Sequence, residues 1–188
     1  MNVYISGVGG QGTGMLSEIL VRAIDYSGKN FRAVDTHGLA QRGGTVVSQI
    51  RFGEKVFTPL IRSGEAHICI ALELHEALRS MEKYIRDGGI LVYYDTVWEP
   101  LGVRLGADKK IREQDVLEFC KEHKVKAVKA FDINLADVKM QNIVILAKIA
   151  ERKLIEDVTP ELIEKAMGDL MEGKMLESNL KVFKENLK

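Results

Sequence analysis

A glycine-rich loop between a strand-like segment and a helix-like segment constrains the fold of this chain more than any other feature. Residues 2–6 have the apolar character of a short buried strand, and residues 15–27 repeat apolar side chains at helical spacing. The loop occupies residues 7–14, and a second strand-like segment at 31–35 follows the helix. This order predicts a parallel crossover unit of about 30 residues.

The loop fits the spacing G-x-G-x-x-G at a position where such loops bind anions. It supplies five candidate site residues, which are Gly7, Gly9, Gly10, Gln11 and Gly12. The start of the following helix would offer unpaired N–H groups and a positive dipole end to a phosphate. Asp35 closes the second strand, where a dinucleotide-binding fold holds an acid against ribose. The motif alone leaves two interpretations open: contact with a phosphate or cofactor, and glycines that only permit tight packing.

The remaining pattern alternates strands with helices. Further strands are predicted at 46–52, 67–71, 90–94 and 127–130, and the first would form a hairpin with 56–57. Further helices are predicted at 73–86, 113–123 and 138–151, from the N-cap residue Thr159 onwards, and at 175–188. We therefore expect the α/β class, with a three-layer, Rossmann-like and mostly parallel sheet, helices on both faces and a helical C-terminal third. A single domain over residues 1–188 accommodates all of these elements.

A second glycine-rich segment directly follows the strand at 31–35. Its candidate site residues are His37, Gly38, Gln41, Arg42, Gly43 and Gly44. The Arg42 guanidinium offers a planar fork for a carboxylate or phosphate, and His37 could donate, accept or transfer a proton. Bonds to loop carbonyls or to a partner subunit explain these two side chains equally well. The sequence fixes no second catalytic group nearby, so catalytic residues stay unassigned.

Composition excludes several classes of function. Lysine plus arginine and aspartate plus glutamate number 27 each, so the net charge gives no indication of a nucleic-acid or anionic-membrane partner. No apolar run approaches the roughly 20 residues of a membrane span, and no signal-peptide pattern is seen, which predicts a cytoplasmic protein. The two cysteines, Cys69 and Cys120, are too few for a four-thiolate cluster or a zinc ribbon. No metal site is expected, because Arg79 stands where a zinc-protease helix starting at His75-Glu76 needs a second histidine.

Taken together, the two glycine-rich segments resemble a known family. Gly7-Val8-Gly9-Gly10-Gln11-Gly12 and His37-Gly38-Leu39-Ala40-Gln41-Arg42-Gly43-Gly44 resemble the gamma-type subunit of 2-oxoacid:ferredoxin oxidoreductases. The second segment is most similar to the beta subunit of indolepyruvate ferredoxin oxidoreductase, which serves aryl pyruvates. The resemblance covers nearly the whole chain. Asn142 matches the family, whereas Ala136-Asp137 and Ala147 stand where Gly-Asn and Gly are common, which leaves the role of that helix open.

The resemblance implies a small subunit that does no chemistry alone. In the family, a 2-oxoacid is decarboxylated on thiamine diphosphate, electrons pass through 4Fe-4S clusters to ferredoxin, and the acyl group goes to coenzyme A. This sequence contains neither the cluster cysteines nor a Gly-Asp-Gly…Asn thiamine motif. Thiamine diphosphate and the clusters are therefore expected on a larger partner subunit, with no cofactor bound by this chain alone and a homodimer possible when the chain is isolated.

Two alternatives belong to other classes. The first is a free-standing NAD(P)-dependent dehydrogenase with a Rossmann domain, and the second is a nucleotide-binding or coenzyme A-binding module of another complex. The resemblance predicts that the isolated chain is inactive with 2-oxoacids and has no meaningful NAD affinity.

Overall fold

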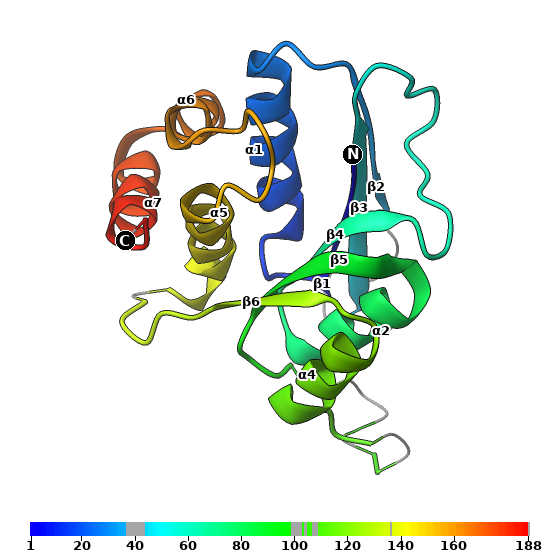
Figure 1. Ribbon diagram of the computed structural model, residues 1–188. Helices are drawn as coiled ribbons and strands as arrows, with labels where there is room; N and C mark the ends of the chain where they lie inside the picture. The colour runs from blue at the N-terminus through cyan, green and yellow to red at the C-terminus, as the bar shows by residue number, and fades with distance from the viewer. Residues whose placement is uncertain (37–43, 99–102, 104, 107–108, 136, 188) are drawn as a thin grey trace.

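The fold is organised around one mixed sheet of six strands in the order β2-β3-β1-β4-β5-β6, shown in Figure 1. This computed structural model describes residues 1–36, 44–98, 103, 105–106, 109–135 and 137–187. The strands are β1 (Asn2–Val8), β2 (Phe31–Thr36), β3 (Thr45–Phe52), β4 (Ala66–Ala71), β5 (Ile85–Tyr94) and β6 (Lys126–Ala130). Strands β1, β4, β5 and β6 are parallel, and β3 runs antiparallel to both of its neighbours, β1 and β2.

Helices cover both faces of this sheet. They are α1 (Thr13–Tyr26), α2 (Leu74–Tyr84), α4 (Glu113–Glu122), the 3₁₀ turn η1 (Val138–Met140), α5 (Gln141–Glu151), α6 (Pro160–Leu170) and α7 (Gly173–Glu185). Figure 1 shows α1, α5, α6 and α7 on one side of the sheet and α2 and α4 on the other. Each side has its own hydrophobic cluster. The predicted three-layer, mostly parallel architecture and the helical C-terminal third are confirmed.

The burial of β1 explains why the core divides in two. All seven residues of β1 are buried, as expected for a central strand that is covered on both faces. Val3 and Ile5 belong to the cluster beneath α1 and α5, whereas Tyr4 belongs to the cluster beneath α2. Because successive side chains of a strand point to opposite faces, one short apolar segment supports both helical layers.

The largest correction concerns the segment predicted at 46–52. We expected it to form a hairpin with 56–57, but β3 instead pairs with β1 on one side and β2 on the other, and 56–57 is not a strand. Strands β1 and β2 run parallel, as the predicted crossover unit requires, but β3 lies between them. An interior position gives β3 backbone partners on both sides and buries Ile50 completely, which an exposed hairpin would not do.

Smaller differences lie at element ends. The helix predicted at 73–86 ends at Tyr84, and β5 begins at Ile85 rather than at residue 90, with a register shift against β4. The start of α6 is confirmed, because the Leu162 N–H donates to the Thr159 hydroxyl at 3.4 Å.

Candidate functional site

The candidate residues that the structure describes gather at one edge of the sheet. Strands β1, β4, β5 and β6 end at this carboxyl edge, and the antiparallel strand β3 begins there. Val8 of β1 lies opposite Thr45 of β3, so the first glycine-rich loop and the end of the second segment are neighbours. In open α/β sheets, ligands bind at this edge.

Two glycines of the first loop are required by their surroundings. A Cβ atom on Gly7 would lie 2.7 Å from the Thr13 hydroxyl oxygen and 3.2 Å from the Leu72 Cβ, so only glycine lets the strand pass this close to α1. Gly12 has a φ of +80°, and a Cβ atom there would lie 2.6 Å from Nδ2 of Asn142. Gly7 thus allows close packing of β1 against α1, and Gly12 allows close packing of the loop against α5.

Gln11 fills the interior of the loop. Its side chain is buried; Oε1 accepts the Val8 N–H at 2.7 Å, and Nε2 donates to the Leu72 carbonyl at 3.3 Å. The Gln11 N–H also donates to the Val8 carbonyl at 3.1 Å. The side chain thereby joins the ends of β1 and β4 from inside the loop. Because it fills the interior, a ligand could contact only the outer surface of the loop.

The outer surface lies beside two helix starts. Asn142, in the first turn of α5, donates from Nδ2 to the Gly12 carbonyl at 3.2 Å and so joins α5 to the loop. Within the described part of the chain, no side chain caps α1, whose first turn contains no acidic residue. Among the same residues, the buried Thr13 hydroxyl has no hydrogen-bond partner. An uncapped helix start of this kind is suited to an anion.

Of the second glycine-rich segment, only Gly44 is described. His37, Gly38, Gln41, Arg42 and Gly43 lie outside the described residues. The Gly44 carbonyl accepts the Gly9 N–H at 2.9 Å, which joins the two segments directly. The segment therefore leaves the sheet after Thr36 and returns to it beside the first loop.

Across the same edge, the turn between β4 and α2 is built around Glu73. Its fully buried carboxyl group accepts the N–H groups of His75 at 3.0 Å, of Glu76, and of Trp98 at 3.4 Å. It also lies 3.1 Å from Nδ1 of His75, whose Nε2 accepts the Ile111 N–H at 3.3 Å. Because Nε2 is an acceptor, Nδ1 carries the hydrogen and donates it to Glu73. This chain of contacts ties the segment after β5 to α2.

A second buried carboxyl group lies one helical turn further along. Glu76 accepts a hydrogen bond from the Thr45 hydroxyl at 3.0 Å and forms an ion pair with Arg79. Burial raises the pKa of Glu76, and the nearby Glu73 acts in the same direction, against the opposing effect of Arg79 and Thr45. Thr45 follows Gly44 directly, so this cluster supports the end of the second glycine-rich segment.

Sequence analysis identified neither Glu73 nor Glu76 as a site residue. Glutamate is not among the preferred N-cap residues, and His75 and Glu76 were considered only as parts of a zinc-protease pattern. The contacts that reveal this cluster come from residues remote in the sequence: the Trp98 N–H donates to Glu73, and the Ile111 N–H donates to His75. A buried helix start directly after a core strand is the one signal that could have pointed to it.

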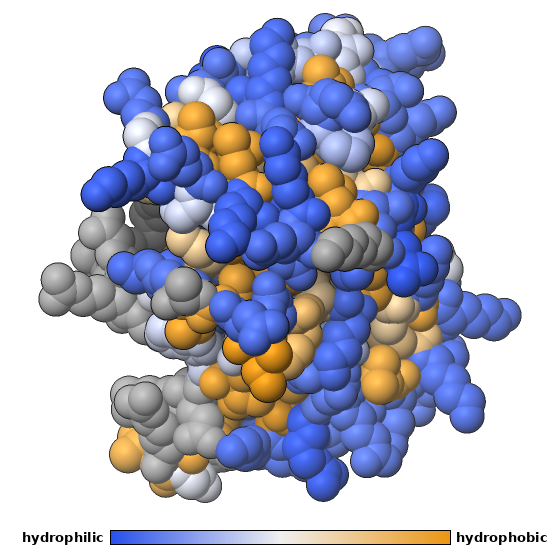
Figure 2. Space-filling model, turned by 90° about the vertical axis from the view of Figure 1, so that its left-hand side faces the viewer, coloured by the Kyte–Doolittle hydropathy of each residue, from blue (hydrophilic) through white to orange (hydrophobic). Residues whose placement is uncertain are grey.

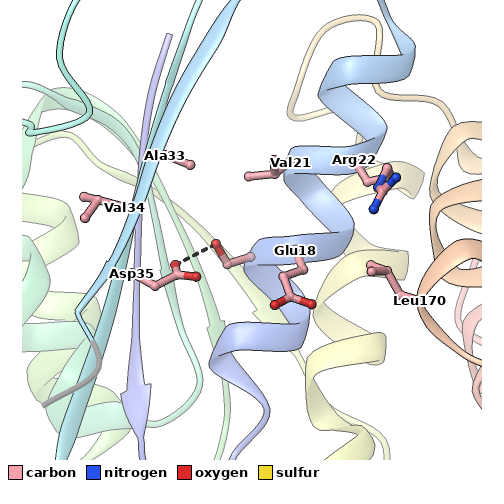
Figure 3. A pocket seen from close by; sticks show the side chains of 8 residues that line it. Glu18, Val21, Arg22, Ala33, Val34, Asp35 and Leu170 are labelled. Carbon is pink, nitrogen blue, oxygen red and sulfur yellow. Dashed lines mark hydrogen bonds between the residues drawn. The ribbon is translucent and has the colours of Figure 1, made fainter.

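Asp35 does not occupy the position that a dinucleotide-binding fold requires. Strand β3 separates β2 from β1, so Asp35 lies one strand further from the first loop than in a β1-β2 neighbour pair. Its carboxylate accepts a hydrogen bond from the Ser17 hydroxyl at 3.1 Å, drawn in Figure 3. It also lines a groove between α1 and β2.

The described residues contain neither a cluster of metal ligands nor a membrane-spanning helix. Within the part of the chain that the structure describes, no three His, Cys, Asp or Glu side chains are grouped as metal ligands. Among the same residues, no helix has the length and apolar character needed to cross a membrane.

Comparison with known proteins identifies similar oxidoreductase subunits. The chain is 31% identical over 188 residues to indolepyruvate oxidoreductase subunit IorB of Archaeoglobus fulgidus, covering 98% of this chain and 92% of that protein. It is 34% identical over 122 residues to the subunit of the same name from Thermococcus kodakarensis, covering 61% and 60% of the two chains.

Solved structures share the fold. The gamma subunit of a keto/oxoacid ferredoxin oxidoreductase from Geobacter sulfurreducens has a TM-score of 0.63 at 19% identity, covering 99% of this chain and 95% of that chain. A 2-oxoglutarate:ferredoxin oxidoreductase from Magnetococcus marinus has a TM-score of 0.66 at 18% identity, with 99% of this chain covering 30% of that larger one. The family model described as pyruvate ferredoxin/flavodoxin oxidoreductase matches residues 2–188. This match includes both glycine-rich segments, and the chain therefore belongs to the pyruvate ferredoxin/flavodoxin oxidoreductase family.

Proposed function

We propose that this chain is the small subunit of a thiamine-diphosphate-dependent 2-oxoacid:ferredoxin oxidoreductase, with indolepyruvate or another aryl pyruvate as its substrate. The observation that carries the proposal is the similarity to an indolepyruvate oxidoreductase subunit over 98% of this chain. The reaction is an oxidative decarboxylation that yields an acyl-coenzyme A. This chain, a single domain over residues 1–188, assists a larger subunit in that reaction.

The division of cofactors follows from side-chain chemistry. A 4Fe-4S cluster needs four thiolates, and this chain has two cysteines, both buried within separate strand and helix elements. We therefore assign the clusters and thiamine diphosphate to the larger subunit, ferredoxin to the role of electron acceptor, and coenzyme A to that of co-substrate. Free thiols are in keeping with a cytoplasmic protein.

The carboxyl edge is the surface we assign to contact with the larger subunit or with an anionic group of coenzyme A. Its site residues are Gly7, Gly9, Gly10, Gln11 and Gly12 in the first loop and His37, Gly38, Gln41, Arg42, Gly43 and Gly44 in the second. A Cβ atom on Gly10 would have no atom of the described residues within 4 Å, so these residues leave the outer surface of the first loop open. The uncapped start of α1 favours a phosphate or carboxylate there.

Exposed hydrophobic side chains beside the loops support a protein contact. They come from the loops after β5 and β6 and from η1, and they are Trp98, Phe131, Ile133 and Val138, which are 41%, 50%, 82% and 60% exposed. Figure 2 views the side of the molecule where α6, α7 and the loop after β6 lie, and its lower half shows hydrophobic residues between hydrophilic ones. Permanent subunit contacts bury about 2,000 Å² or more and are rich in such residues.

A free-standing NAD(P)-dependent dehydrogenase is less well supported. Gln11 fills the interior of the first loop, and β3 separates Asp35 from that loop. A dinucleotide would need both the loop and the acid on adjacent strands. Micromolar binding of NAD(H) in calorimetry would favour this alternative over our proposal.

Coexpression with the thiamine-binding subunit tests the proposal. A stable complex should reduce ferredoxin when an aryl pyruvate and coenzyme A are supplied, and the isolated chain should be colourless and inactive. Within that complex, Arg42→Ala should weaken binding or the transition state by about 1.5–3 kcal/mol, the scale of a charged hydrogen bond, and His37→Ala should have a smaller effect. Failure of the subunits to copurify at moderate salt contradicts the proposal.

A further inference from the structure

A groove runs along one side of the molecule, between α1 and the edge strand β2. Its volume is about 420 Å³, and its walls include Glu18, Val21 and Arg22 from α1, Ala33 and Asp35 from β2, and Leu170 from α6. Figure 3 shows Ala33 and Val21 turned toward each other across it, with Glu18 and Arg22 projecting from the helix. The groove lies beside the sheet, and none of its described wall residues comes from the first glycine-rich loop.

Strand β2 is an unusually regular sheet edge. Its six residues pair with β3 without a register shift, and the strand contains no proline. Natural edge strands are normally protected by bulges, prolines or lysines, because unpaired backbone groups invite another strand. The opposite edge strand, β6, carries Lys126 and Lys129, and Lys129 forms ion pairs with Asp95 and Glu113. Strand β2 has no lysine; its charged side chains are Arg32 and Asp35, and Asp35 accepts a hydrogen bond from Ser17 of α1.

The charged residues of α1 beside this edge are complementary to the same residues in a second copy of the chain. Glu18 and Arg22 are exposed, lie four residues apart on α1 and so share one helix face. Among the described residues, Glu18 has no ion-pair partner, and Arg22 reaches only Asp169, at 3.8 Å. A two-fold axis beside β2 would bring Glu18 of each copy toward Arg22 of the other.

We infer that a second copy of this chain docks on the groove, with the two β2 strands pairing antiparallel about a two-fold axis perpendicular to the sheet. That axis keeps both α1 helices on the same face of the joined sheet. Helix α1 lies mainly over β3, so three strand spacings, roughly 14 Å, would separate the two helices. This distance exceeds direct helix contact, and two long charged side chains can span it. The inference goes beyond the proposed function, since the carboxyl edges stay free for the larger subunit.

Charge exchange on the isolated chain tests the inference. Light scattering after size exclusion should give twice the mass of the chain at about 50 μM, with Glu18→Arg and Arg22→Glu each shifting the protein to monomer by at least tenfold in the dissociation constant. The combined variant with both changes should recover the dimer. Glu122→Arg, on α4 across the sheet, makes the same charge change and should leave the dimer intact.

A cysteine pair tests the strand pairing independently of charge. The two-fold axis passes at Ala33 or Val34, so either Ala33→Cys or Val34→Cys should give a covalent dimer with oxidised glutathione, because paired strands lie within disulfide distance. Any one of four results would overturn the inference: the parent chain is monomeric, the single charge variants stay dimeric, the double variant folds but stays monomeric, or neither cysteine variant forms a crosslink. The inference would also be overturned if Glu18→Arg abolished binding of the larger subunit but left the homodimer intact. The activity of the reconstituted complex reports separately on the proposed function.

Discussion

Two strand-to-helix turns lie at the carboxyl edge, and they differ in whether a side chain caps the helix that follows. In the turn from β4 to α2, the Glu73 carboxyl group accepts the first N–H groups of the helix. In the turn from β1 to α1, Gly12 stands at the N-cap and no side chain caps the helix. Here Gln11 bonds to Val8 and Leu72, which belong to the sheet, and leaves the helix start untouched.

The difference shows where an external anion can bind. A helix start that already holds a buried carboxyl group has its N–H groups occupied, and a second negative group nearby would be repelled. The start of α1 has neither obstacle. The two turns have the same topology but differ in their capacity to bind an external anion. We call the turn from β4 to α2 the closed turn, because Glu73 occupies its helix start, and the turn from β1 to α1, which is built from glycines, the open turn.

The closed turn should lose the most stability when its acid is removed. Glu73→Ala leaves several buried N–H groups without an acceptor, and each such loss costs about 1–3 kcal/mol, so we expect the free energy of unfolding to fall by about 3–5 kcal/mol. Urea unfolding followed by circular dichroism measures this. Glu73→Gln retains one acceptor oxygen and should lose about half as much. A loss below about 1 kcal/mol for Glu73→Ala would break the contrast between the turns.

The open turn depends on the geometry of its glycines. Gly12→Ala combines a positive φ with a Cβ contact of 2.6 Å to Asn142, so we expect a loss of about 2–3 kcal/mol in the free energy of unfolding. Gly10→Ala is the matched control, since its φ is +103° but nothing lies within 4 Å of the added Cβ. Equal losses for the two variants would show that backbone strain alone, and not the contact with α5, requires Gly12.

Local periodicity predicted most of the elements but not the place of β3. Helix α1 was predictable because Leu16, Ile19, Leu20 and Ala23 repeat at helical spacing and all four are buried. The alternation at 46–52 correctly predicts a strand. Its partners could not be predicted, since the pairing of β3 with β1 joins Asn2 to Arg51 across nearly 50 residues, and no local pattern reports on that contact.

The candidate site was predictable to the same extent. The spacing of the first loop predicted its place between strand and helix, because glycine at fixed positions reflects backbone geometry. Gln11 was identified as a candidate site residue, but its bonds to Val8 and Leu72 could not be predicted, because they form only when β1 and β4 lie side by side in the sheet. Glu73 was missed because its function depends on backbone groups brought in from residues 98 and 111, by way of His75 for the latter.

Gln11 tests whether the interior of the open turn is truly filled. Gln11→Ala leaves the Val8 N–H without its acceptor and removes the bond to Leu72, so we expect a loss of about 1–2 kcal/mol in the free energy of unfolding. Gln114→Ala, on the exposed surface of α4, is the control and should change stability by no more than about 0.5 kcal/mol. If both variants unfold alike, the side chain contributes nothing to the loop.

The smallest expected effect is a change in pH dependence at the closed turn. Burial raises the pKa of Glu76 above its ordinary value of 4.5, so the folded chain binds this proton more tightly than the unfolded chain. The resulting stabilisation is fully present below pH 4.5 and is lost as the pH rises through the folded-state pKa.

Glu76→Gln removes this titration. The difference in free energy of unfolding between variant and parent should therefore move in favour of the variant as the pH rises from 4.5 toward 7, whatever constant offset comes from losing the ion pair with Arg79. Urea midpoints at closely spaced pH values measure the slope, and Glu82→Gln, an exposed position on the same helix, is the control. A parent and variant that change in parallel would mean that Glu76 is not desolvated. The closed turn would then lack the second buried acid that distinguishes it most clearly from the glycine turn beside it.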